Sequence, residues 1–322
     1  MKMISFTILS ILLTSFATRE YKSPYDLAFV EKNMAYIPAG THTNAGSDQG
    51  LPLKYREAVR TITVERFHMY NHEVTNGLYV YYVNELRKKD TTAYRKALPD
   101  TAIWKTEYNY MEPYVQYYFR HPAYADYPVV GITHNQCLEF CKWLTNAYNT
   151  NPKRKFKKVE FDLPSLDQWE YAARGGLKMS PFPWGGPYMQ NKKGEWLANF
   201  RQFSQSGIWR EEYETTSSTG IKYTEVRYVA SGGGGDIAGS PGTLNDAADI
   251  TAPAKSYYPN DYKLYNMAGN VEEFVKEEGK TKGGSWRDSG YYLQNSVYEE
   301  YDPVQSASTE RGFRFVMKVI EQ

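Results

Sequence analysis

The segment from Leu264 to Val271 reads LYNMAGNV, and Gly283-Gly284-Ser285-Trp286 follows it a short distance along the chain. Other stretches combine glycine, proline and aromatic residues in the same manner: Pro128-Val129-Val130-Gly131, Leu163 to Gly176, Phe182-Pro183-Trp184-Gly185 and Gly312-Phe313-Arg314. Turn-forming residues at this density favour short elements joined by many loops. The sequence shows no repeat of fixed period and no linker between two hydrophobic cores. We therefore predict a single domain with long loops.

Composition narrows the classes of function. The 322 residues include 38 Lys and Arg against 37 Asp and Glu, a net charge of +1. Binding of nucleic acid needs clustered cations that displace counterions, so this balance argues against a nucleic-acid partner. Hydrophobic residues make up 41% of the chain, which is typical of a globular protein. Many of the 30 tyrosines lie in residues 79–127 and 257–301, and we expect them to form a contact surface for a protein partner.

The N-terminus has the pattern of a secretory signal. Lys2 precedes an apolar run from Ile4 to Phe16, which ends in small residues around Ala17. Such a run is too short to span a bilayer. We predict a signal peptide over residues 1–17, export of the domain formed by residues 18–322, and a periplasmic location; a buried N-terminal strand or helix is the alternative. No cysteine follows the run, so we expect no lipidation, and no later segment is apolar enough for a transmembrane helix.

Local patterns place several elements along the chain. Apolar residues recur at helical spacing over 76–88 and 134–148, and Ser165 with Gln168 predicts a capping box at the start of another helix. Residues 90–127 are expected to be irregular. Residues 200–250 contain four consecutive glycines and are expected to form a surface insertion. The glycine run lacks the Lys-Ser/Thr of a phosphate loop, which excludes nucleotide binding.

The two cysteines, Cys137 and Cys141, lie one turn apart on the predicted helix over 134–148. We expect two buried thiols that pack this helix against the core, because unpaired cysteine is among the most buried residue types. A strained disulfide, or a metal site completed by ligands from elsewhere, is the alternative.

In their order and spacing, the glycine- and tryptophan-rich stretches resemble the formylglycine-generating-enzyme domain, also called the sulfatase-modifying factor domain. The resemblance runs from about residue 33 to residue 319 and includes Glu73-Val74-Thr75. It implies one compact α+β domain related to the C-type lectin fold, with little regular structure and bound calcium.

The sequence departs from this family at the positions that carry its chemistry. The family's enzymes oxidise a substrate cysteine with a pair of cysteines that bind copper just after the Gly-Gly-Ser-aromatic motif. The corresponding positions here are Asp288 and Leu293, which cannot form a thiolate site. A second branch of the family uses iron and a histidine triad, and none of the five histidines has the required spacing. We therefore expect no copper, no iron, no catalytic residue and a protein that is not an enzyme.

The resemblance also implies two calcium sites made of hard oxygen ligands. The first site corresponds to Asn266, Gly269, Val271 and Glu273. The second site corresponds to Asn199, Phe200, Asp246 and Ala248. The alternative for the first site is that its Asn and Glu only cap a turn and a short helix.

Residues 97–131 resemble the gliding-motility lipoproteins of the K and J type, which are structural parts of the gliding and type IX secretion machinery. This chain lacks the lipobox cysteine of those proteins. The resemblance implies a non-catalytic, exported structural or interaction protein of the cell envelope, associated with the outer membrane through other envelope or secretion-machinery proteins. A copper- or iron-dependent oxidase of the superfamily and a lectin-like ligand-binding module are the alternatives.

Overall fold

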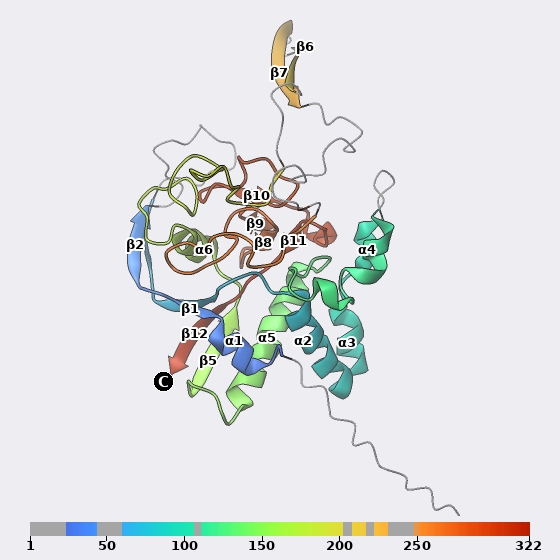
Figure 1. Cartoon of the computed structure of the whole chain (residues 1–322), viewed down its shortest axis with the longest axis vertical. Coiled ribbons are helices and arrows are strands. Elements are labelled where there is room, and N and C mark those ends of the chain that lie inside the picture. The colour runs from blue at the N-terminus through green and yellow to red at the C-terminus, as the bar shows by residue number, and fades with distance from the viewer. Residues whose placement is uncertain are drawn as a thin grey trace, which may run out of the picture.

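The computed structural model describes residues 24–43, 60–105, 111–201, 208–216, 222–230, 248 and 250–322 (Figure 1). The predicted signal peptide, the glycine run and Asp246 lie outside these residues. The helices are α1 (Leu27–Lys32), α2 (Asn76–Lys89), α3 (Thr91–Ala97), α4 (Glu112–Tyr117), α5 (His134–Thr150) and α6 (Leu166–Ala173), with 3-10 turns η1 (Thr101–Trp104), η2 (Pro122–Tyr124) and η4 (Pro303–Gln305). The strands are β1 (Met34–Ile37), β2 (Gly40–Thr43), β3 (Thr61–Val64), β4 (Phe67–Tyr70), β5 (Lys158–Asp162), β6 (Ile208–Thr216), β7 (Lys222–Ala230), β8 (Glu272–Phe274), β9 (Lys280–Lys282), β10 (Tyr298–Glu300), β11 (Arg311–Gly312) and β12 (Val316–Glu321).

A four-stranded antiparallel sheet in the order β1-β4-β12-β5 separates two hydrophobic cores. Side chains alternate between its faces. Tyr70, Phe161 and Met317 point into the larger core, which α2 and α5 cover, whereas Met69 and Val316 point into the smaller core beneath α6. The sheet therefore joins the helical layer to the loop-rich part of the domain.

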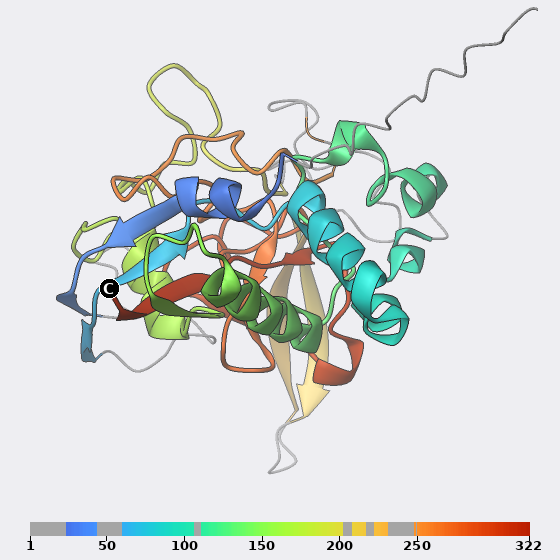
Figure 2. The same cartoon turned by 90° about the horizontal axis from the view of Figure 1, so that it is seen from below.

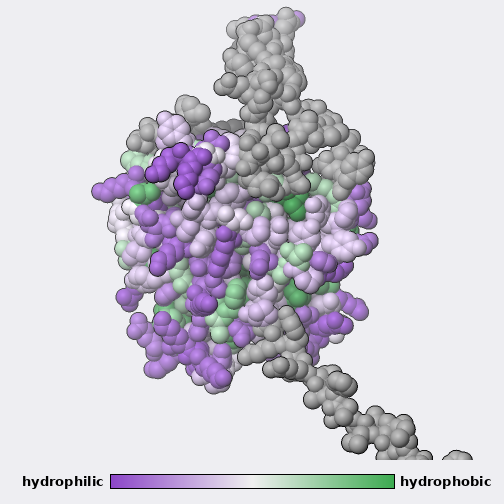
Figure 3. Space-filling view, in the orientation of Figure 1, coloured by the Kyte–Doolittle hydropathy of each residue, from purple (hydrophilic) through white to green (hydrophobic). Residues whose placement is uncertain are grey.

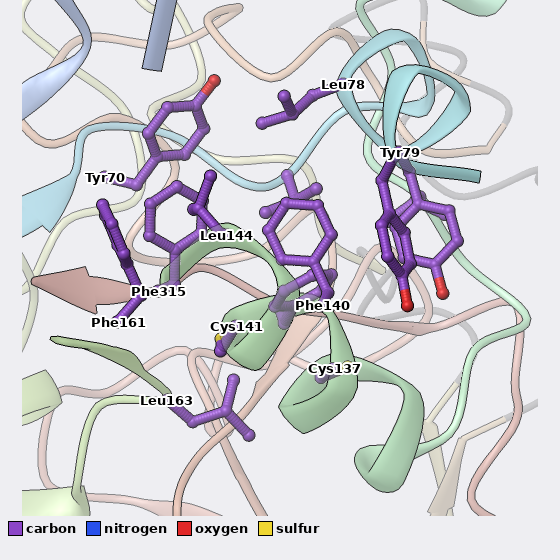
Figure 4. Packing of buried hydrophobic residues seen from close by; sticks show 14 of the residues in the cluster. Tyr70, Leu78, Tyr79, Cys137, Phe140, Cys141, Leu144, Phe161, Leu163 and Phe315 are labelled. Carbon is purple, nitrogen blue, oxygen red and sulfur yellow. The ribbon is translucent and has the colours of Figure 1, made fainter. Parts of the chain in front are cut away.

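Helix α5 supplies much of the larger core. Thr133 and Gln136 form a capping box at its start. Figure 4 shows Phe140 of this helix beside Tyr79 of α2, with ring centroids 5.8 Å apart. Cys137 and Cys141 are unpaired and buried in this core, as predicted, and burial raises the pKa of both thiols. These thiols are therefore packing groups at neutral pH.

A second sheet, in the order β10-β9-β8-β11, lies in the loop-rich part. Its strands are two or three residues long, and β11 pairs with β8 in parallel. The second sheet therefore brings together short segments that are spread over residues 272–312. Residues 200–250 contain a regular antiparallel hairpin, β6–β7.

The expectation that residues 90–127 are irregular is wrong. They contain α3, η1, α4 and η2, and the first two of these begin at the side-chain caps Asp90 and Asp100. The Asp90 and Asp100 side chains accept free amide groups at the start of α3 and η1, a contribution that apolar periodicity alone does not reveal.

The predicted tyrosine contact surface is also largely wrong. Tyr79, Tyr82 and Tyr118 are buried, and the Tyr118 hydroxyl donates to the Pro128 carbonyl at 2.7 Å. Tyrosine here supplies core volume together with an internal hydrogen bond. The face drawn in Figure 3 is mostly hydrophilic, with small apolar areas between polar ones. Within the described part of the chain, no helix is both long and apolar enough to cross a membrane.

Candidate functional site

The Gly283-Gly284-Ser285-Trp286 stretch forms a tight turn at the end of β9. Both glycines have positive φ, +95° and +65°. A Cβ on Gly284 would lie 2.8 Å from Leu293 Cδ1, and one on Gly283 would lie 3.0 Å from the Trp169 ring. Only glycine meets both the backbone and the space requirements at these positions. Trp286 is buried behind the turn and donates its indole N–H to the Thr309 carbonyl at 3.1 Å.

Asp288, at the position of the family's first thiol, closes this turn. Its Oδ2 accepts hydrogen bonds from the Ser285 amide at 2.7 Å and from the Ser285 hydroxyl at 2.5 Å. Its carbonyl accepts the amide of Arg201 at 2.8 Å. Asp288 is therefore a partly exposed carboxylate anchored to the turn by Ser285.

Leu293, at the position of the second thiol, is fully buried. It packs in a small apolar cluster with Phe182, Ala198, Phe200 and Ala268. Met189, Trp184 and Trp196 of the preceding loop pack against the same cluster. Leu293 therefore ties the turn to the loop over residues 182–200 and presents no reactive group.

Three further carboxyl groups and two guanidinium groups gather beside the Asp288 carboxyl. We call this set the carboxylate–arginine cluster: Glu272, Asp288, Glu299, Glu310, Arg287 and Arg311. Arg311 Nε lies 2.7 Å from Glu272 Oε1, and Arg287 Nη1 lies 3.2 Å from Glu310 Oε1. Glu272 is buried at the bottom and also accepts from the Thr281 hydroxyl, whereas the other members are partly exposed. The second sheet assembles the cluster, because Arg311 pairs directly with Glu272 across β11 and β8.

The cluster holds protons near neutral pH. Burial, reinforced by Asp288 and Glu310, raises the pKa of Glu272 to about 7 even though Arg311 opposes the shift. Burial and the neighbouring carboxylates raise the pKa of Glu299 to about 10. Like charges this close cannot all ionise, so the carboxyl groups share protons. Among the residues with described positions, no three His, Cys, Asp or Glu side chains converge as a metal site.

Glu273, expected as a calcium ligand, is instead paired with Arg314. The Arg314 Nε donates to both Glu273 oxygens at 2.8 and 2.6 Å, and Nη2 donates to Oε1 at 2.5 Å. The indole N–H of Trp169 donates to Oε2 at 2.7 Å. A carboxylate neutralised by a guanidinium is a poor calcium ligand, so the residues of the first site do not fit the ion in this arrangement.

The two asparagines of the predicted calcium sites have buried side-chain oxygens without a hydrogen-bond donor, Asn266 Oδ1 and Asn199 Oδ1. The Asn266 amide donates to Glu73 at 3.1 Å, and the Asn199 amide donates to the Ile250 carbonyl at 2.8 Å. Gly269 lies against the Asn199 carbonyl, where a Cβ would come within 2.3 Å. The two predicted sites are therefore neighbours, and an unpartnered acceptor at Asn199 fits a cation.

The fold and this turn together define the class of the protein: a loop-rich α+β domain related to the C-type lectin fold. The Treponema denticola variable protein 1 has a similar structure, with a TM-score of 0.51 and 16% identity over 88% of this chain and 94% of that one. The model of the sulfatase-modifying factor enzyme 1-like domain matches residues 25–319, and the chain belongs to this family.

Two relatives illustrate the range of the family. The formylglycine-generating enzyme of Mus musculus is 26% identical over 84% of this chain and 61% of its own length. The inactive C-alpha-formylglycine-generating enzyme 2 of Bos taurus is 25% identical over 59% of this chain and 50% of its own length. The chain thus spans only half to three fifths of the length of these two relatives.

The comparisons contradict the prediction that the protein is not an enzyme. Four relatives at 23–26% identity are named formylglycine-generating enzyme, an enzyme family. The prediction rested on Asp288 and Leu293 at the thiol positions and on the lack of a histidine triad. A missing thiol pair excludes thiolate chemistry at these two positions, but it does not exclude catalysis by other groups.

The carboxylate–arginine cluster was not predicted from the sequence. Its members are spread from residue 272 to residue 311, and no local spacing relates them. Several Glu and Arg residues follow the Gly-Gly-Ser-Trp motif in the sequence. Their spacing does not indicate which of them are close in space, because that depends on how the strands pair.

Proposed function

We propose that the protein is an exported structural or interaction component of the cell envelope, with another envelope or secretion-machinery protein as its partner. The resemblance of residues 97–131 to the gliding-motility lipoproteins and the signal-like N-terminus support this assignment. In this proposal the protein acts in the periplasm and associates with the outer membrane through its partners.

The observation that carries the proposal is a set of exposed apolar side chains in the loop over residues 177–196 and at Tyr258. Leu177, Met179, Tyr188 and Tyr258 are 38%, 40%, 78% and 65% exposed. The Tyr258 hydroxyl donates to Glu195 at 3.2 Å, which joins it to the loop that carries Tyr188. Exposed apolar groups of this kind mark protein contacts, and tyrosine is enriched at interfaces.

This exposed group lies next to the carboxylate–arginine cluster. Met189, in the same loop as Tyr188, lies against Gly290, two residues beyond Asp288. The cluster combines both signs of charge, with Glu310 26% exposed and Arg287 37% exposed. Apolar contacts provide affinity, and neighbouring charges select the partner.

A second function, catalysis by carboxyl groups, is supported by the protonation of the cluster. A carboxyl with a pKa near 7, such as Glu272, can donate or accept a proton at neutral pH. Cuprous ion requires the thiolate pair that Asp288 and Leu293 do not supply, so the residues do not fit copper.

We also propose calcium at the Asn199 position. The unpartnered Asn199 Oδ1 and the Phe200 carbonyl would be ligands, and calcium would there stabilise the junction between this loop and Gly269. Glu273 takes no part, since Arg314 already neutralises it.

The experiment that tests the interaction role is cross-linking of the tagged full chain in native envelope, followed by mass spectrometry of the linked peptides. We expect links that map to residues 177–196 or 258 and join a single partner. The double substitution Tyr188→Ser/Tyr258→Ser should abolish these links, whereas Tyr36→Ser, which removes an exposed tyrosine elsewhere, should leave them. Links that survive the double substitution would refute this surface.

A parallel assay addresses the reaction of the relatives. The chain is incubated aerobically with copper and a Cys-x-Pro-x-Arg peptide, and the peptide mass is measured. An aldehyde product would assign the relatives' reaction to this chain and overturn the interaction role as its main function. The variant Asp288→Cys/Leu293→Cys serves as a comparison, because it restores both thiols.

A further inference from the structure

A cavity of about 200 Å³ opens on the opposite side of the large sheet from α6. It lies at the edge of the larger core, between α1 and the connection from α5 to β5. Figure 2 shows α1 and α5 on this side of the sheet, with β4 and β12 between them. None of its lining residues belongs to the carboxylate–arginine cluster or to the exposed group around Tyr188.

The floor of the cavity is one row of cross-strand neighbours. Tyr36 pairs with His68, His68 pairs with Met317, and Met317 pairs with Phe161. Directly paired residues of antiparallel strands present their side chains on the same face. The Tyr36 and His68 rings touch edge to face at 5.5 Å. Solvent exposure decreases along this row, from the exposed Tyr36 to the buried Met317 and Phe161. The cavity therefore has an open mouth and an apolar inner end.

The roof is held in place by polar contacts. Glu31 of α1 accepts the Tyr148 hydroxyl at 2.6 Å and the backbone amide of Lys155 at 3.1 Å. These bonds tie the connection between α5 and β5 to α1. The ring of Phe156 then lies 5.7 Å from the His68 ring and forms one wall. The cavity is therefore formed in advance of any ligand, which favours binding.

The mouth carries one ammonium group without an acidic partner. Lys155 Nζ lies 5.1 Å from the centre of the Phe156 ring, and no carboxylate in the described part of the chain forms an ion pair with it. Glu31 also lines the cavity, and its Oε1 accepts both the Tyr148 hydroxyl and the Lys155 amide on the roof. Burial and Lys155 lower the pKa of His68, so this imidazole is neutral at pH 7. Lys155 is therefore the one Lys or Arg among the residues that line the cavity, and its ammonium is the cation that a ligand would meet at the mouth.

We propose that this cavity binds a small carboxylate with an apolar or aromatic body. The body lies on Met317 and Phe161, and the carboxylate meets the Lys155 ammonium at the mouth. The volume is below the range of roughly 300–1,000 Å³ for drug-sized ligands, so the body is about one aromatic ring with a short chain. The ligand is either a free acid or the C-terminal residue of a polypeptide. This inference does not depend on the proposed function.

The test uses the full chain labelled with ¹³C at its methionine methyl groups and titrated with 3-phenylpropionate. Met34 and Met317 line the cavity, and the other seven of the nine methionines serve as internal controls. We expect the two cavity methyl signals to shift with saturation below about 10 mM, since such small ligands bind weakly. The neutral 3-phenylpropanamide should bind about 1.5-fold to fivefold more weakly, the range for one exposed charge contact. Absence of shifts at Met34 and Met317 would overturn the proposal.

Two lysine variants test the charge contact. In Lys155→Met, the acid and the amide should bind with about equal affinity. Lys153 lies in the same connection but does not line the cavity, so Lys153→Met should leave the preference for the acid unchanged. Equal affinity for acid and amide in the unmodified protein would refute the carboxylate assignment. A peptide ending in phenylalanine with a free carboxylate separates the sources: tighter binding than phenylpropionate indicates a polypeptide terminus, and weaker binding indicates a free acid.

Discussion

The buried pair of Glu273 and Arg314 provides the sharpest test of how this domain is held together. Their side chains are 1% and 0% exposed, and three short hydrogen bonds join them. Arg314 also donates to the Tyr265 carbonyl at 2.9 Å. The substitution Arg314→Met removes the cation while keeping most of the apolar stem. It leaves the Glu273 carboxylate buried with only the Trp169 indole as a donor.

The expected loss is large, because a buried carboxylate without its cation has neither water nor a counter-charge. Breaking one partner of a buried pair costs about 3–5 kcal/mol. The double variant Arg314→Met/Glu273→Gln removes the charge and keeps an acceptor for Trp169. We therefore expect it to recover about 2 kcal/mol of the loss, which makes the two substitutions strongly non-additive.

The assay is urea unfolding at neutral pH, followed by tryptophan fluorescence and circular dichroism. Arg60→Met serves as the control, since Arg60 pairs with Asp167 at the surface at 3.2 Å; it should cost less than about 1 kcal/mol. A loss below about 1 kcal/mol for Arg314→Met, or a double variant less stable than the single one, would refute the reasoning.

Four further predictions concern titration, the turn, the thiols and calcium. Burial raises the pKa of Glu73 to about 8 from 4.5, so the folded state holds a proton that the unfolded chain loses. The contribution of this bound proton to the free energy of unfolding is fully present below about pH 4.5 and is lost as the pH rises through about 8. Glu73→Gln should therefore reduce the slope of the free energy of unfolding against pH, measured by urea unfolding, by up to about 1.4 kcal/mol per pH unit. Asp288→Ala should lower stability by about 1–3 kcal/mol in calorimetry, because the Ser285 amide and hydroxyl lose their acceptor, while Asp288→Asn should cost less. Both thiols should react with Ellman's reagent only as the protein unfolds, and rapid reaction of the native protein would contradict their burial. Chelation of calcium should lower the melting temperature, and Asn199→Ala should remove this response; an unresponsive parent protein would exclude the ion.

Elements with strong local signals were predictable. The helix that carries Cys137 and Cys141 and the capping box at Ser165 stand where the sequence places them. Apolar periodicity and caps involve residues within a few positions of one another, so the sequence alone records them. The helices within residues 90–127 were not predicted, because they are six or seven residues long and depend on caps and packing more than on periodicity.

Residue type alone did not decide which tyrosines face solvent. Tyr118 is buried against Trp104, with ring centroids 4.8 Å apart, while the adjacent Tyr117 is 51% exposed. Tyrosine suits both environments, since its ring is apolar and its hydroxyl can bond to protein or to water. Only the packing around α4 separates the two.

The family, the mixed α+β class and the lack of thiols at Asp288 and Leu293 follow from residue identity and order, so the amino-acid sequence was sufficient to establish them. Which charged side chains pair in this part of the domain depends on the tertiary structure. It paired β11 with β8 so that Arg311 meets Glu272, and it placed Arg314 on Glu273, the expected calcium ligand. Charges separated by tens of residues interact only when folding brings them within a few ångströms in a medium of low dielectric constant, and no local pattern records that distance.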